Sequence, residues 1–149
     1  MSKAVVPRRT LWEDRFSRPT VAALVQGCPR ATSALVESVR ERLIGLGLSE
    51  SLAWRGLPWR WAMSYGPPRA ESAYLVPRPA GPSLAIRVAN ERAKELEIRK
   101  LARSIREGLG TARLVAGVAW PEWELKAKSQ CDELVGFLQT MLGDEVGAR

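Results

Sequence analysis

Arginines and aromatic residues alternate with small residues in the middle of this 149-residue chain, and their side chains are the best suited to bind a ligand. Residues 51–88 contain five arginines and a single acid, Glu71. Arg55, Arg60 and Arg87 are expected on one face of the strands in this segment, between small residues. A guanidinium group can hold a phosphate or a carboxylate with two parallel hydrogen bonds. The pattern therefore predicts a shallow basic surface for an anionic small molecule or a nucleic acid, with an ordinary solvated surface as the alternative.

The aromatic residues of the same segment have two interpretations. Trp59, Trp61, Met63 and Tyr65 occupy alternate positions, which places them together on the other strand face. An exposed face of this kind would stack nucleobases, whereas a buried one would form the core beneath amphipathic helices. The core interpretation is favoured because large apolar side chains are mostly buried in folded proteins. In a mixed arrangement, one end of this face lines a pocket closed by Trp120 or Trp123.

Catalytic and metal-binding chemistry is restricted by what the sequence lacks. It has no histidine, which removes Ser-His and Cys-His nucleophile pairs and the commonest metal ligand. Its two cysteines, Cys28 and Cys131, cannot form a tetrahedral zinc site alone and are expected to be free thiols. We expect no cofactor and no metal. A carboxylate-only metal site and an enzyme with a carboxylate base remain as alternatives.

Hydrophobic periodicity and turn residues indicate which elements carry these side chains. The connections between the expected strands are short, which favours antiparallel neighbours. The predicted fold class is α+β, a single domain in which a mainly antiparallel sheet of about five strands has helices packed on one face. Residues 111–119 fit a helix or a strand. The expected helices span residues 20–26, 33–46, 91–107 and 129–142, and the expected strands span residues 51–54, 59–65, 72–76, 83–88 and 120–126.

The domain organisation follows from composition. We expect an extended arm over residues 1–18, one domain over 19–143 and a loose tail over 144–149. No apolar run reaches the roughly 20 residues that span a bilayer, and the first residues lack the apolar segment of a signal peptide. The expectation is therefore a cytoplasmic protein without membrane contact.

Several motifs resemble those of a known family. They are LAW at residues 52–54, WRWAMSY at 59–65, AYLVP at 73–77 and WPEWELK at 120–126, followed by a terminal helix. With them the chain resembles the YdhG-like group of small bacterial domains of unknown function, among the domain-of-unknown-function families 1801 and 3788. The resemblance implies a compact α+β domain without an assigned activity. Iron binding, described for some relatives, is not carried over, because the close carboxylates here alternate with arginine and lysine.

The function expected from the sequence is non-enzymatic binding. The formal net charge is +7, which attracts anionic partners. A protein-interaction or self-association module, such as a homodimer, is the alternative, and an enzyme with a carboxylate base is the third hypothesis. The candidate ligand-binding residues are Arg55, Arg60, Arg87, Trp59, Trp61, Tyr65 and Trp123.

Overall fold

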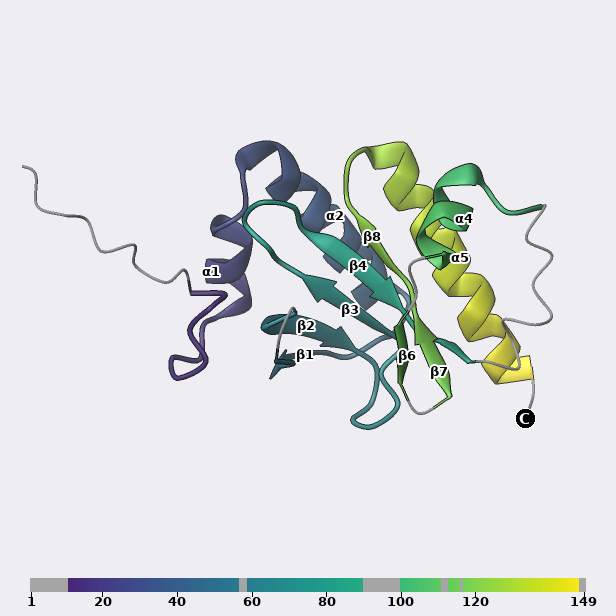
Figure 1. Ribbon diagram of the computed structural model, residues 1–149, viewed down its shortest axis with the longest axis horizontal. Helices are drawn as coiled ribbons and strands as arrows, with labels where there is room; N and C mark the ends of the chain where they lie inside the picture. The colour runs from purple at the N-terminus through teal and green to yellow at the C-terminus, as the bar shows by residue number, and fades with distance from the viewer. Residues whose placement is uncertain (1–10, 57–58, 90–99, 111–112, 116, 148–149) are drawn as a thin grey trace, which may run out of the picture.

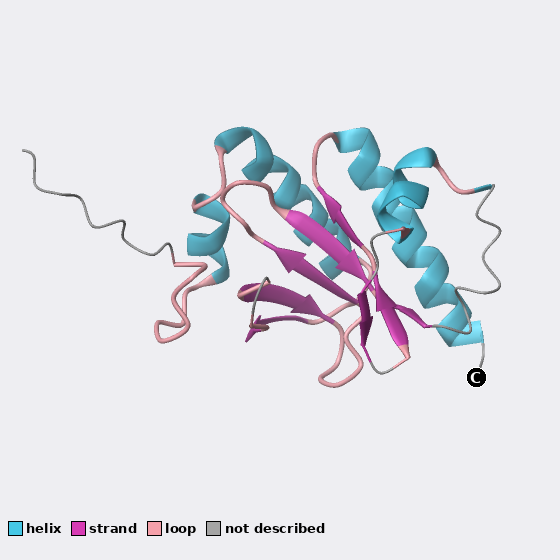
Figure 2. Cartoon of the chain, in the orientation of Figure 1, coloured by secondary structure: helices cyan, strands magenta, loops and turns pink. Residues whose placement is uncertain are grey.

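The computed structural model describes residues 11–56, 59–89, 100–110, 113–115 and 117–147. A five-stranded antiparallel sheet forms the centre, with strand order β1-β2-β3-β4-β8 (Figure 1). Helices pack against this sheet, so the predicted α+β class is confirmed (Figure 2). The strands are β1 (Glu50–Trp54), β2 (Trp61–Tyr65), β3 (Ala73–Val76), β4 (Ser83–Ile86) and β8 (Glu122–Glu124).

The two long helices, Arg30–Gly45 and Lys128–Gly147, pass behind the sheet in the view of Figure 1. The Thr20 hydroxyl caps the first helix of the chain by accepting a hydrogen bond from the Ala23 N–H at 3.1 Å. The second presents Val36, Val39 and Leu43 at helical spacing, and all three are fully buried. The helices are α1 (Val21–Gln26), α2 (Arg30–Gly45), α4 (Arg103–Leu109) and α5 (Lys128–Gly147). No helix in the described ranges is long and apolar enough to cross a bilayer.

The main core lies between the sheet and the helices. Trp61, Met63 and Tyr65 point into it from β2, and Trp123 points into it from β8. These positions confirm the interpretation that Trp61 and Tyr65 are core residues. The sheet residues alternate as expected, because successive side chains of a strand point to opposite faces.

The opposite face of the sheet is buried as well. Its centre holds a second apolar cluster, on which Trp12 and Trp120 pack. Ser64 and Ser83 on this face are also buried, so the expected open basic surface is wrong at the centre of the sheet. The cluster consists of Trp59, Ala62, Tyr74, Val76 and Ala85.

A second, three-stranded sheet explains how Trp120 reaches this face. It has the order β5-β7-β6, and its strand β7 directly precedes β8 in the chain. We predicted one strand over residues 120–126, but the chain changes sheets at Pro121, which has no N–H to donate to a ladder. The ambiguous segment 111–119 contributes strands to this sheet. Its strands are β5 (Val88–Ala89), β6 (Arg113–Val115) and β7 (Val118–Trp120).

Trp59 is a correction to the predicted alternation. It belongs to the second cluster, on the opposite face from Trp61. The cause is Arg60, which adopts a left-handed backbone conformation with φ of 56° and interrupts the strand. The regular alternation therefore begins only at Trp61.

The remaining boundaries differ at the ends of the chain. Helix α5 continues to Gly147, so the tail expected to be loose from residue 144 is helical that far. Most of the helix predicted over 91–107 lies outside the described residues, and α4 begins within the described part at Arg103 and continues to Leu109. The first ten residues of the predicted arm also lie outside them, whereas Trp12 packs on the sheet.

Candidate functional site

Arg55 and Arg60 lie side by side where β1 turns into β2. The Arg55 N–H donates to the Arg60 carbonyl at 2.7 Å, and the Arg60 N–H donates to the Gly56 carbonyl at 2.5 Å. Gly56 has a φ of 71°, a conformation that favours glycine. These two bonds close the turn, and we call Arg55 and Arg60 the arginine pair.

Both guanidinium groups of the arginine pair lie over aromatic rings. The Arg55 guanidinium carbon is 4.8 Å from the centroid of the Tyr74 ring, and that of Arg60 is 5.3 Å from Trp12. Trp12 is itself held by a 2.9 Å hydrogen bond from its indole N–H to the Trp59 carbonyl. A guanidinium stacked on a ring keeps its N–H groups at the ring's edge, where they can bind a ligand.

The two arginines differ in their charged neighbours. Arg60 forms a loose ion pair with Glu13 at 3.8 Å. Arg55 is exposed and forms no ion pair with any described residue. Burial raises the pKa of the Tyr74 phenol beneath it, an effect that the charge of Arg55 opposes and that of Glu71 supports. Tyr74 is therefore neutral at neutral pH, and Arg55 has the more available positive charge of the pair.

Arg87 is not part of the arginine pair. Its N–H donates to the Ser72 carbonyl at 2.9 Å, and the Ser72 N–H donates to the Tyr65 carbonyl. Tyr65 is the last residue of β2, whereas Arg60 precedes the first. At about 3.3 Å per residue, roughly 15 Å of strand separates the two ends. The three arginines predicted to share one surface are therefore two at one end of the sheet and one at the other.

A carboxylate that the sequence did not single out lies beyond the aromatic cluster. Glu122 accepts hydrogen bonds from the Trp59 indole N–H at 2.8 Å, from the Ser83 hydroxyl at 2.5 Å and from Arg78. Burial pushes the pKa of Glu122 up, but the hydrogen bonds from Arg78 and Ser83 outweigh burial and hold that pKa below its ordinary value. Glu122 is thus charged and fully engaged at neutral pH.

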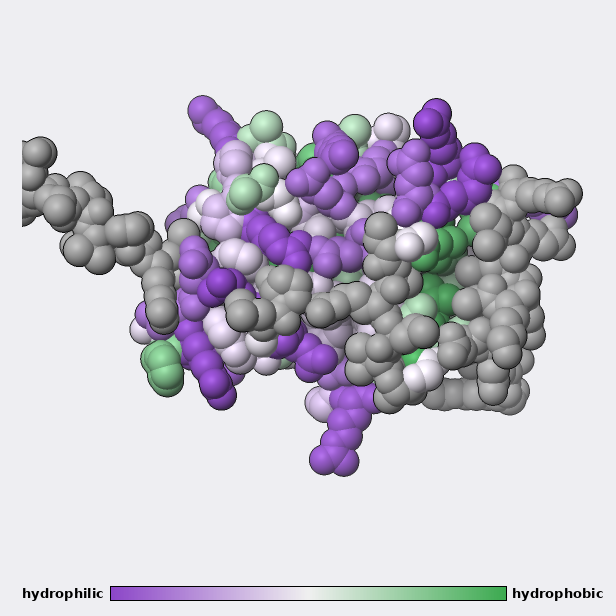
Figure 3. Space-filling view, in the orientation of Figure 1, coloured by the Kyte–Doolittle hydropathy of each residue, from purple (hydrophilic) through white to green (hydrophobic). Residues whose placement is uncertain are grey.

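Next to Glu122 the surface has a hollow of about 440 Å³, within the range of small-molecule sites. Hydrophilic side chains (purple) project around the rim of the molecule in Figure 3, with paler residues between them. The Trp120 ring in the hollow's wall is 5.1 Å from the Tyr74 ring, so the hollow and the arginine pair adjoin the same aromatic cluster. The hollow is lined by Arg78, Ala80, Gly81, Ser83, Trp120, Glu122 and Glu124.

The other predicted site residues have structural partners. The Trp61 indole N–H donates to the Asp14 carbonyl at 2.7 Å, and that of Trp123 donates to the Ser104 carbonyl at 3.0 Å. Tyr65 donates its hydroxyl proton to Glu50 at 2.7 Å. None of the three lines the hollow. These side chains belong to the main core, on the opposite face of the sheet from Tyr74, on which Arg55 stacks.

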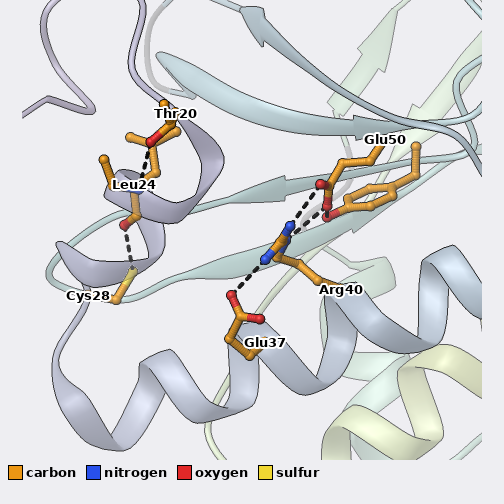
Figure 4. A network of polar contacts seen from close by, with 8 residues as sticks. Thr20, Leu24, Cys28, Glu37, Arg40 and Glu50 are labelled. Atoms are coloured by element: carbon orange, nitrogen blue, oxygen red, sulfur yellow. Dashed lines mark hydrogen bonds and ion pairs between the residues drawn. The ribbon is translucent and has the colours of Figure 1, made fainter.

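Glu50 links Tyr65 to helix α2. Figure 4 shows Arg40 of this helix pointing toward Glu50 and Glu37. Arg40 donates two hydrogen bonds to the Glu50 carboxylate, each of 2.9 Å, and a third to Glu37 at 2.7 Å. Burial raises the pKa of Tyr65, and the nearby Glu50 charge raises it further. This network ties the edge strand β1 to the helical layer.

The described residues hold no group of three Cys, Asp or Glu side chains placed to bind a metal ion. Cys28 and Cys131 are buried free thiols, and burial raises the pKa of each. No family model, curated protein or solved structure matches the chain. The YdhG-like resemblance and the cytoplasmic location accordingly stay predictions.

Proposed function

We propose that this chain is a non-enzymatic binding domain that takes a phosphate-bearing anion at the arginine pair. The observation that carries the proposal is the Arg55 guanidinium, which is stacked on Tyr74 and has no carboxylate partner among the described residues. Phosphate suits this group because the planar fork of a guanidinium matches two phosphate oxygens.

The surroundings of Arg55 favour an anion in two further ways. Residues 51–88 have an excess of four positive charges, and the whole chain carries +7, so the field around the protein attracts negative ligands. Tyr74 is only 2% exposed and packs against Trp59 at a ring distance of 5.3 Å. The ring under Arg55 is thus fixed, which lowers the entropy lost when the guanidinium binds.

A salt-dependent titration tests this function. Three probes distinguish a nucleic-acid ligand from a small phosphate ligand. They are a fluorescently labelled single-stranded oligonucleotide, the matching duplex and inorganic pyrophosphate. We expect binding at low salt that weakens as the salt concentration rises, because each phosphate contact displaces counterions. Absence of binding by all three probes at low salt, or affinity that does not change with salt, would contradict the proposal.

Self-association is a second candidate, favoured by apolar side chains on the segment that precedes α1. Phe16 is 87% exposed and Leu11 is 49% exposed. Such residues mark an interaction surface when they are grouped, and the two lie within one short segment. Sedimentation velocity over a hundredfold range of concentration tests this candidate. A shift towards a dimer that Phe16→Ser abolishes supports it, and a constant monomer contradicts it.

A further inference from the structure

The two carboxylates of the hollow differ in how much hydrogen-bonding capacity they have left. Glu122 is satisfied by Trp59, Ser83 and Arg78. The side chain of Glu124 is 52% exposed, and its ion pair with Lys126 is long, at 3.7 Å. Glu124 therefore offers free acceptor oxygens to a ligand with N–H groups, since an ionised carboxylate accepts hydrogen bonds and donates none.

The position of Glu124 depends on a close approach to the β3–β4 turn. A Cβ atom at Gly81 would lie 2.1 Å from Glu124 Oε1, so the end of the Glu124 side chain rests against Gly81. The backbone beneath is fixed as well, because the Leu125 N–H donates to the Pro82 carbonyl at 2.8 Å. This hydrogen bond holds the strand that carries Glu124 against the β3–β4 turn at the edge of the hollow.

Trp120 gives the hollow a rigid aromatic wall. Its ring meets Trp59 edge to face, with centroids 6.1 Å apart and planes at 85°. Tyr74 contacts it from a second direction at 5.1 Å. A half-buried indole held by two neighbours can stack a flat ligand at small entropic cost.

The hollow and the arginine pair lie close enough for one ligand to reach both. Arg55 is 4.8 Å from the Tyr74 ring, and Tyr74 is 5.1 Å from the Trp120 ring. These distances place the guanidinium within about 10 Å of the indole. In a nucleotide a single sugar separates the phosphate from the base, so one nucleotide covers this span.

From this arrangement we infer that the phosphate-bearing ligand is a guanine nucleotide, an inference that rests on the function proposed above. Its phosphate binds Arg55, its base stacks on Trp120, and its Watson–Crick edge meets Glu124. Guanine fits because its N1–H and its amino group are adjacent donors that match the two oxygens of one carboxylate. Hypoxanthine lacks the amino group, and uracil presents a carbonyl on either side of its single donor.

Calorimetric titration of the full chain with three ligands tests the inference. The ligands are guanosine 5′-monophosphate, inosine 5′-monophosphate and ribose 5-phosphate, which differ by the amino group and then by the whole base. We expect the guanine nucleotide to bind roughly tenfold more tightly than the inosine nucleotide, since a bidentate contact to a base edge discriminates by about that factor. Ribose 5-phosphate should bind most weakly.

Glu124→Gln supplies the decisive comparison, with Glu107→Gln as the matched control on α4. Glu124 is a half-exposed side chain, so its substitution should leave the melting temperature unchanged. The Glu124→Gln variant should bind the guanine and inosine nucleotides equally and ribose 5-phosphate as the wild type does, whereas Glu107→Gln should keep the tenfold preference.

The outcomes separate the inference from the function on which it rests. If ribose 5-phosphate and both nucleotides bind the wild type equally, the phosphate site stands and the guanine site is wrong. If Glu124→Gln keeps the preference for guanine, the inference is overturned too. If none of the three ligands binds at low salt but an oligonucleotide or pyrophosphate does, the guanine site alone is wrong. If those probes do not bind either, both proposals fail.

Discussion

Arg60 adopts a left-handed backbone conformation, with φ of 56°, that is unfavourable for residues other than glycine. Arg60→Ala and Arg60→Gly both remove the guanidinium, but only glycine is unstrained at this φ. We therefore expect the free energy of unfolding of Arg60→Gly to be about 1 kcal/mol higher than that of Arg60→Ala. Urea denaturation of the two variants measures the difference. Equal stabilities would mean that the turn relaxes and that Arg60 is unstrained.

Glu122 makes the stability of the protein sensitive to acid. Hydrogen bonds from Arg78 and Ser83 outweigh burial and keep its pKa below the ordinary value in the folded state. The stability contributed by Glu122 is therefore present above the ordinary carboxyl pKa and is lost as the pH falls through the lower, folded-state pKa. We expect the free energy of unfolding to decrease as the pH falls below the ordinary carboxyl pKa, and to decrease less steeply in Glu122→Gln.

Urea denaturation at several pH values provides the test, with the exposed Glu41→Gln as the matched control. A Glu122→Gln slope as steep as that of the wild type would show that Glu122 is not held in its charged form.

At this scale, local spacing predicted the arginine pair but not the ion pair between Arg78 and Glu122. Arg55 and Arg60 are close in sequence, and their turn could be read from Gly56 and the residues after it. Arg78 and Glu122 are 44 residues apart, and their contact depends on the pairing of β4 with β8. No local pattern shows such a pairing. Trp59 was assigned to the wrong face because alternation carries no sign of the left-handed residue beside it.

Helix α4 can pack closely on strand β8 because Gly108 has no side chain. A Cβ atom at Gly108 would lie 1.9 Å from the Trp123 indole nitrogen. We expect Gly108→Ala to lower the free energy of unfolding by about 1–3 kcal/mol, the usual cost of overpacking a filled core. Chemical denaturation measures this loss.

Gly136 provides the matched control for this prediction. It lies inside helix α5, and a Cβ atom there would meet nothing within 4 Å. Gly136→Ala should stabilise the protein by about 0.5–1 kcal/mol, because alanine favours the helix. Equal effects of the two substitutions would contradict the packing described for α4.

The order and type of most elements were predictable because helices and strands carry different periodicities. The connection between β7 and β8 was not, since Pro121 changes sheets without changing the alternation around it. Ala119 and Trp123 both belong to the main core, whereas Trp120 packs on the second cluster. The sequence left open whether Trp120 or Trp123 closes a pocket, and the structure places Trp120 in the wall of the hollow and Trp123 in the main core.

For the whole molecule, the main finding is a sheet with apolar clusters on both faces. The sequence predicted a basic, open face opposite the helices, and small residues such as Ala62 and Ala85 gave that impression. They are small because Trp59, Tyr74 and Trp120 pack over and among them. The arginines are consequently displaced to the edges of this face, where Arg55 is stacked on a fixed ring.

Binding of phosphate by Arg55 is the central claim, and one comparison tests it most directly. The affinity of wild type, Arg55→Gln and Arg30→Gln for a single-stranded oligonucleotide is measured across a series of salt concentrations. Arg30 is exposed at the start of α2, on the helical side, and the Arg30→Gln substitution removes the same charge as Arg55→Gln. We predict that Arg55→Gln weakens binding and reduces the slope of log affinity against log salt by about 1, whereas Arg30→Gln changes neither. Equal effects of the two substitutions would contradict a phosphate site at Arg55 and would leave only the general attraction of a basic protein.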